Sequence, residues 1–146
     1  MNLSNVTFEE KSTWVSLAAV LFVYGGYFSQ VFEGLMNNSL NKGEIGGLFI
    51  GSVVTLVIIQ VVLQIILAVS NSKDANRQSD ERDRLFALKA GYTSDWVLSF
   101  GILTIAVSIF LHDLDPLWTA NLLFFLLVVS QVVCYVLTLF FYRRGY

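Results

Sequence analysis

Four long apolar runs dominate this sequence, and they constrain its fold more than any other feature. They cover residues 13–32, 46–70, 94–111 and 116–142. A helix needs about 20 apolar residues to cross about 30 Å of hydrocarbon, and these runs approach or exceed that length. They do not alternate polar and apolar residues, as the strands of a membrane barrel do. The sequence therefore predicts an all-α membrane protein, a single domain over residues 1–146 in which four transmembrane helices form a bundle.

The composition also indicates a membrane protein. Hydrophobic residues make up 55% of the 146 residues and charged residues only 14%, with a mean hydropathy of +0.67. These values lie outside the range of soluble globular domains. The first run follows an acidic segment and lacks a small-residue cleavage pattern, so we interpret it as a span and not as a signal peptide. We expect a multi-pass protein of the cell inner (plasma) membrane, surrounded by the lipid bilayer.

The cations are distributed unevenly between the two sides of the predicted bundle. Four spans place both termini and the loop of residues 71–93 on one side, and that side carries eight of the nine cations. Lys42 is the remaining cation, and it falls on the other side. Short loops rich in Lys and Arg stay in the cytoplasm. The N- and C-termini and the loop 71–93 are therefore predicted to be cytoplasmic.

The loop between the second and third spans is unusually charged. Residues 73–95 hold ten of the twenty charged residues of the chain. The pattern predicts a short cytoplasmic amphipathic helix between these spans, ended by Gly91. Its apolar stripe would consist of Leu85, Leu88 and Tyr92, which have the spacing of one helix face. The charged face is either a solvated connector or a docking surface, and the candidate cytoplasmic contact residues are Asp80, Glu81, Arg82 and Lys89.

Two short motifs in this loop carry a resemblance. The sequence has DER at Asp80–Arg82 and KAGY at Lys89–Tyr92, just before the third span. In this respect it resembles a group of small prokaryotic four-span integral membrane proteins of unknown function. The resemblance implies a four-helix membrane fold in a bacterium or archaeon, and it implies no activity or cofactor.

The middle of each span lacks ionisable residues. Proton relays and ion-coupled pumps usually need such a group inside the membrane. The chain has one histidine and one cysteine, too few for a metal site of its own, and no serine or cysteine nucleophile with a neighbouring His–acid pair. It has no phosphate-binding glycine motif and no basic face for nucleic acid. We therefore expect no enzymatic activity, no cofactor, no metal and no nucleic-acid partner.

Three glutamines interrupt the spans. Gln60 and Gln64 share one helix face at i, i+4, and Gln131 lies at a similar depth in the fourth span. Amides at equal depth can hydrogen-bond across a helix interface, so one interpretation is that Gln60 and Gln131 hold the bundle or a dimer together. The other interpretation is that the three glutamines line a polar conduit or ligand site.

Two stripes of small residues predict close helix packing. The second span contains Gly47-x-x-x-Gly51-x-x-x-Thr55, and the first contains Gly25-x-x-x-Ser29. Small residues at this spacing let two membrane helices approach closely. Both stripes lie at the same depth in the predicted topology, so we expect the first two spans to pack tightly there.

These features favour one functional hypothesis and leave a second open. The first is a non-enzymatic integral membrane protein that acts through protein–protein contacts, as a homodimer or as an accessory or sensor subunit. Its partner would be a second copy, another membrane protein or a cytoplasmic protein. The alternative is a transporter or channel for a small solute, assembled as an oligomer around the intramembrane glutamines.

Overall fold

A computed structural model describes residues 7–70, 81–112 and 114–144 of the chain. Within these residues the chain forms four helices: α1 (Phe8–Met36), α2 (Lys42–Ser70), α4 (Glu81–Leu111) and α5 (Pro116–Arg144). Each is long and apolar enough to cross a membrane. The predicted all-α fold with four such helices is confirmed.

The helices begin at polar caps that lie outside the apolar runs. The Thr7 hydroxyl accepts a hydrogen bond from the backbone N–H of Glu10 at the start of α1. At the start of α2, Asn41 and Glu44 accept hydrogen bonds from each other's backbone N–H in a reciprocal capping box. Asp115 caps α5 just before Pro116, the residue type best suited to a first helical position. With these caps, α1 and α2 begin at Phe8 and Lys42, before their apolar runs begin.

The structure does not support a separate amphipathic helix before the third span. Helix α4 runs unbroken from Glu81 to Leu111, and Gly91 lies inside it. A glycine ends a helix where the chain turns away, but here the following hydroxyls of Thr93 and Ser94 bond back to the carbonyls of Lys89 and Gly91. The charged segment is therefore the first part of the third long helix.

The buried face of this first part of α4 also differs from the prediction. The expected stripe of Leu85, Leu88 and Tyr92 is exposed. The buried residues are Phe86, Ala90 and Ser94, each one turn after the last. The ring of Phe86 packs against those of Phe141 and Tyr142 near the end of α5. The partner helix, and not the hydrophobicity of the stripe, decides which face is covered.

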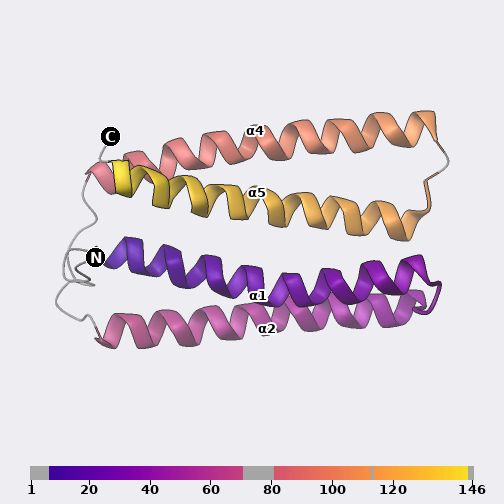
Figure 1. Ribbon diagram of the computed structural model, residues 1–146, viewed down its shortest axis with the longest axis horizontal. Coiled ribbons are helices and arrows are strands. Elements are labelled where there is room, and N and C mark those ends of the chain that lie inside the picture. Colours follow the sequence, from indigo (N-terminus) through magenta and orange to yellow (C-terminus); the bar gives the residue numbers. More distant parts are fainter. Residues whose placement is uncertain (1–6, 71–80, 113, 145–146) are drawn as a thin grey trace.

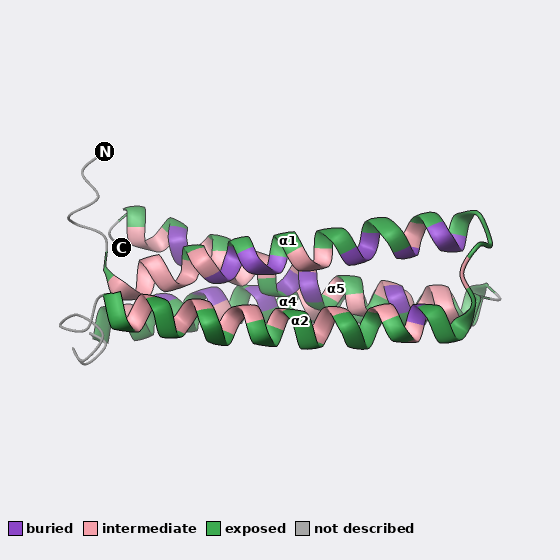
Figure 2. Ribbon diagram, turned by 90° about the horizontal axis from the view of Figure 1, so that it is seen from below, coloured by how far each residue is buried: buried purple, intermediate pink, exposed green. Residues whose placement is uncertain are grey.

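The four helices form a row and not a closed ring. Substantial contacts join α4 to α5, α5 to α1, and α1 to α2. Figure 1 shows this order from top to bottom, with the N- and C-terminal ends of the chain on the same side. We call that side the terminal end and the opposite side the hairpin end. Helices α2 and α4 are the first and last helices of the row. Figure 2 shows α2 exposed along most of its length.

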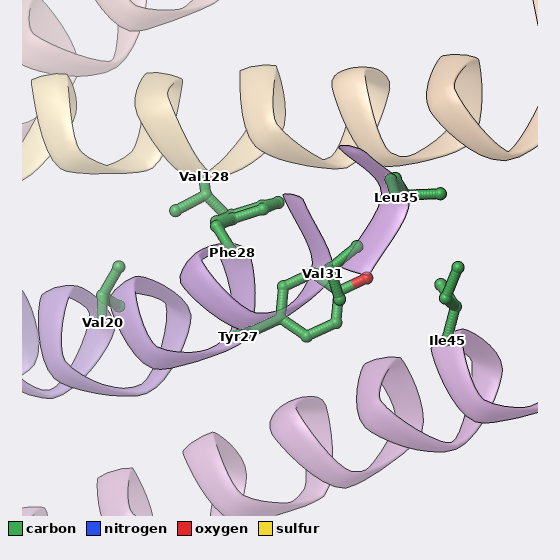
Figure 3. Packing of buried hydrophobic residues seen from close by; sticks show 7 residues of the cluster. All are labelled: Val20, Tyr27, Phe28, Val31, Leu35, Ile45 and Val128. Atoms are coloured by element: carbon green, nitrogen blue, oxygen red, sulfur yellow. The ribbon is translucent and has the colours of Figure 1, made fainter. Parts of the chain in front are cut away.

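The core of the row lies between α1 and its neighbours and is rich in aromatic rings. Its buried members are Val20, Tyr27, Phe28, Val31, Leu35, Ile45 and Val128. Figure 3 shows Phe28 of α1 beside Val128 of α5. Phe124 of α5 makes edge contacts with Tyr27 and with Phe49 of α2. In a bilayer, where lipid is as apolar as these side chains, such shape-specific packing, and not exclusion from water, would hold the helices together.

Candidate functional site

A ladder of hydrogen bonds joins α1 to α2 near the terminal end. The hydroxyl of Ser12 donates to Oε1 of Gln64 at 3.0 Å, and the hydroxyl of Ser16 donates to Oε1 of Gln60 at 3.3 Å. Nε2 of Gln64 also donates to the Ser16 hydroxyl at 3.2 Å. We call these four residues the serine–glutamine ladder. The two glutamines lie i, i+4 on one face, as the sequence indicated, and that face meets the serines.

The expected hydrogen bond between Gln60 and Gln131 is not formed within the chain. Helix α1 lies between α2 and α5 in the row, so the polar face of α2 meets α1 first. Gln131 lies on an exposed part of α5, and its side chain has no hydrogen-bond partner among residues 7–70, 81–112 and 114–144. A similar depth in the bundle does not by itself say which helices are neighbours.

A buried hydrogen bond joins α1 to α5 near the hairpin end. The hydroxyl of Tyr27 donates to Oδ1 of Asn121 at 2.6 Å, and both residues are 4% exposed. Nδ2 of Asn121 donates to the carbonyl of Leu117 in its own helix. This pair was not predicted from the sequence. The available signal was that a buried tyrosine in a span usually needs a partner for its hydroxyl.

The third helix pair, α4 and α5, combines a hydrogen bond with a close approach. The buried hydroxyl of Ser130 donates to the backbone carbonyl of Ser94 at 3.0 Å. Further along, a Cβ placed on Gly101 would lie 2.6 Å from Cδ2 of Leu126. Gly101 therefore allows the close contact that the sequence analysis had assigned to other glycines. Each of the three neighbouring helix pairs has at least one hydrogen bond between its helices.

The two small-residue stripes do not pack against each other, so the predicted close approach of the first two spans is wrong at this depth. A Cβ placed on Gly25, Gly47 or Gly51 would meet no atom within 4 Å. Ser29 and Thr55 are also exposed. The rings of Tyr27 and Phe49 fill the space between the two helices here, with centroids 6.4 Å apart. Two large rings at the crossing keep the helices from approaching through their glycines.

Four of the five stripe residues, Gly25, Ser29, Gly51 and Thr55, instead line an open hollow between α1 and α2. Its volume is about 660 Å³. We call it the α1–α2 hollow. Glycine and hydroxyl side chains form much of its wall, and its lining is Leu21, Phe22, Val23, Gly25, Gly26, Tyr27, Ser29, Gln30, Leu48, Gly51, Ser52 and Thr55. Nε2 of Gln30 donates to the carbonyl of Gly26 within α1.

The candidate contact residues of the charged segment lie on the first turns of α4, at the terminal end. Glu81, Arg82 and Lys89 are exposed, whereas Asp80 lies outside the described residues. The guanidinium of Arg82 lies 5.1 Å from the centre of the Phe86 ring. This cation–π contact holds Arg82 near the bundle surface. A docking role for this segment stays a prediction.

Helix α5 is fixed to its neighbours at the terminal end. The Tyr142 hydroxyl donates a hydrogen bond to the carboxylate of Asp83 in α4. The guanidinium of Arg143 lies 5.6 Å from the ring centre of Trp14 in α1. Contacts from one helix end to two neighbours fix the relative positions of the charged ends of α1, α4 and α5.

Comparison with protein-family models, curated proteins and solved structures finds no match for this chain. The resemblance carried by DER and KAGY therefore stays a prediction. In the described part of the chain, no three His, Cys, Asp or Glu residues are grouped so that they could hold a metal ion. The features that bear on function are the helix contacts and the surfaces that they leave unfilled.

Proposed function

We propose that this protein is a non-enzymatic integral membrane protein that acts through contacts between its spans and other membrane helices. It would work as a homo-oligomer or as an accessory subunit, in the inner (plasma) membrane, with both termini and loop 71–93 in the cytoplasm. The charge distribution of the loops supports this orientation. The length and hydropathy of the four helices support the membrane location.

The α1–α2 hollow is the observation that carries this proposal. Glycine inside a helix is less favourable than alanine by about 1 kcal/mol, so glycines there need a reason. Gly25 and Gly51 have none within the chain, because nothing packs against them. Small residues are enriched where membrane helices meet, since they let the backbones approach. The small residues that line the hollow leave room for a helix from outside the chain to approach α1 and α2 closely.

The open ends of the row support the same conclusion. Helix α2 has α1 as its only substantial neighbour, and α4 has only α5 in the described part of the chain. Helices at the centre of a membrane bundle have neighbours on several sides. This row leaves long helix faces that either lipid or another protein must cover.

The transporter alternative depends on one observation, the exposed amide of Gln131. Gln60 and Gln64 have serine partners across the α1–α2 interface, which favours a structural role for them. Several copies arranged around Gln131 could still line a polar pathway. A solute flux that is lost in Gln131→Leu while the protein stays assembled would favour this alternative.

Site-specific photo-cross-linking in native membranes tests the proposed function. A photoreactive residue at position 51 faces the α1–α2 hollow, whereas one at position 50 does not line it. Ile50 is the matched control, because it lies at the same depth and is 63% exposed. We expect a discrete protein adduct from position 51, either two copies of the chain or one defined partner, and lipid adducts alone from position 50. Lipid adducts alone from both positions would contradict the proposal.

A further inference from the structure

Gln131 differs from the other glutamines of the described helices in having no partner. Gln60 and Gln64 bond to serines of α1, and Gln30 bonds to a carbonyl of its own helix. No hydrogen bond involves the side chain of Gln131 within residues 7–70, 81–112 and 114–144. Exposed hydroxyls in spans can bond to a carbonyl one turn back, but an amide has two donor hydrogens and an acceptor oxygen to satisfy.

The depth of Gln131 makes this unmet amide significant. It lies 15 residues from the start of α5 and 13 from its end, or about 20 Å from either end of the helix. This is the middle of the hydrocarbon, where no water is present to satisfy polar groups. A polar group buried there without a partner costs several kcal/mol. An amide kept at this position therefore indicates a polar partner from outside the chain.

The surface around Gln131 is otherwise suited to contact with a helix. Ala120 and Leu127 lie on the same face of α5 and are exposed, Leu127 by 53%. Phe124, seven residues before Gln131, borders this face and packs against Tyr27 of α1 and Phe49 of α2. The exposed residues of the face therefore lie beside the part of α5 that α1 and α2 cover. They are separate from the α1–α2 hollow, which none of them lines.

We propose that this face of α5 binds the same face of a second copy, with the two Gln131 amides hydrogen-bonded to each other across a two-fold axis. Two copies insert into the membrane with the same orientation, so the two-fold axis that relates them runs along the membrane normal. Each residue of one copy therefore lies at the same depth as the equivalent residue of the other. An isologous contact places equivalent residues opposite one another. A primary amide is self-complementary, because each can donate its N–H to the oxygen of the other. This inference rests on the proposed function and assigns one of its contacts to a second copy.

Self-association in liposomes tests the inference. Energy transfer between donor- and acceptor-labelled protein is measured as the protein is diluted in lipid. We expect Gln131→Leu to raise the dissociation constant about threefold to thirtyfold, the range given by interhelical hydrogen bonds in membranes. Gln131→Asn keeps the amide and should restore part of the affinity. Thr104→Val is the control, because this exposed hydroxyl of α4 bonds to the carbonyl of Phe100 in its own helix and lies outside both proposed contacts, and it should leave the affinity unchanged.

Cysteine cross-linking in the same liposomes locates the contact. In a Cys134→Ser background, Gln131→Cys should form a disulfide-linked dimer on mild oxidation. Val136→Cys, on the opposite face of α5, should not. Wild-type self-association with no effect of Gln131→Leu and no cross-link from position 131 would overturn this inference while leaving the proposed function standing. A wild-type chain that stays monomeric at every dilution, yet cross-links from position 51 to a different protein, would also overturn it.

Discussion

The serine–glutamine ladder gives a prediction whose size follows from its bonds. Ser16 takes part in two of the three hydrogen bonds, and Gln60 and Gln64 together take part in all three. At about 0.6 kcal/mol for each bond between membrane helices, Ser16→Ala should cost about 1.2 kcal/mol and Gln60→Leu/Gln64→Leu about 1.8 kcal/mol. All three changes together break the same three bonds. Their cost should be about 1.8 kcal/mol, and not the sum of about 3.0 kcal/mol, so the coupling energy is about 1.2 kcal/mol.

Unfolding in mixed detergent micelles, followed by circular dichroism at protein concentrations where the chain is monomeric, measures these free energies. Gln131→Leu is the control partner for Ser16→Ala, because Gln131 has no bond to the ladder. Their combined effect should be additive within about 0.5 kcal/mol. A coupling below about 0.5 kcal/mol between Ser16 and the two glutamines would refute the ladder. An equally large coupling between Ser16 and Gln131 would refute the helix order.

Two further predictions concern packing and orientation. Gly51→Ala should be neutral or stabilising by up to about 1 kcal/mol, because a Cβ there meets open space. Gly101→Ala should be the less stable of the two variants, because its Cβ would displace the end of the Leu126 side chain. Equal effects in a micelle unfolding assay would contradict the packing. An impermeant thiol reagent on intact cells should label a cysteine introduced at Asn38 and miss one introduced at Arg144, because the hairpin turns are predicted to lie outside the cell. Labelling at position 144 would contradict the predicted orientation.

The number and type of helices could be predicted from the sequence because one physical requirement controls them. Crossing the hydrocarbon takes about 20 apolar residues, whatever the helix packs against. The same requirement means that the sequence does not show which face of a span contacts another helix, since lipid-facing and partner-facing positions are both apolar. Phe86 was therefore not distinguishable from Leu85 as the residue that meets α5. The unbroken passage of α4 through Gly91 was missed for a related reason, because a glycine ends a helix only where the chain turns away.

The candidate site was also predictable only in part. The shared face of Gln60 and Gln64 follows from helix geometry alone, and the structure has it. Their partners depend on the order of the helices, which no local pattern encodes, so Ser12 and Ser16 were not identified. The small-residue stripes were found correctly as a pattern. Their use was not predictable, because the rings of Tyr27 and Phe49 decide how closely α1 and α2 approach.

Counting the copies in single particles tests the central claim, that the spans of this protein act by contacting other helices. Fluorescently tagged protein would be extracted from its own membranes in lipid nanodiscs, without detergent exchange, and the photobleaching steps of each particle counted. We expect two steps in most wild-type particles and a larger share of single-step particles in Gln131→Leu. Single steps in the wild type, at the density at which the protein occurs in its membrane and with no other protein retained in the particle, would contradict the claim.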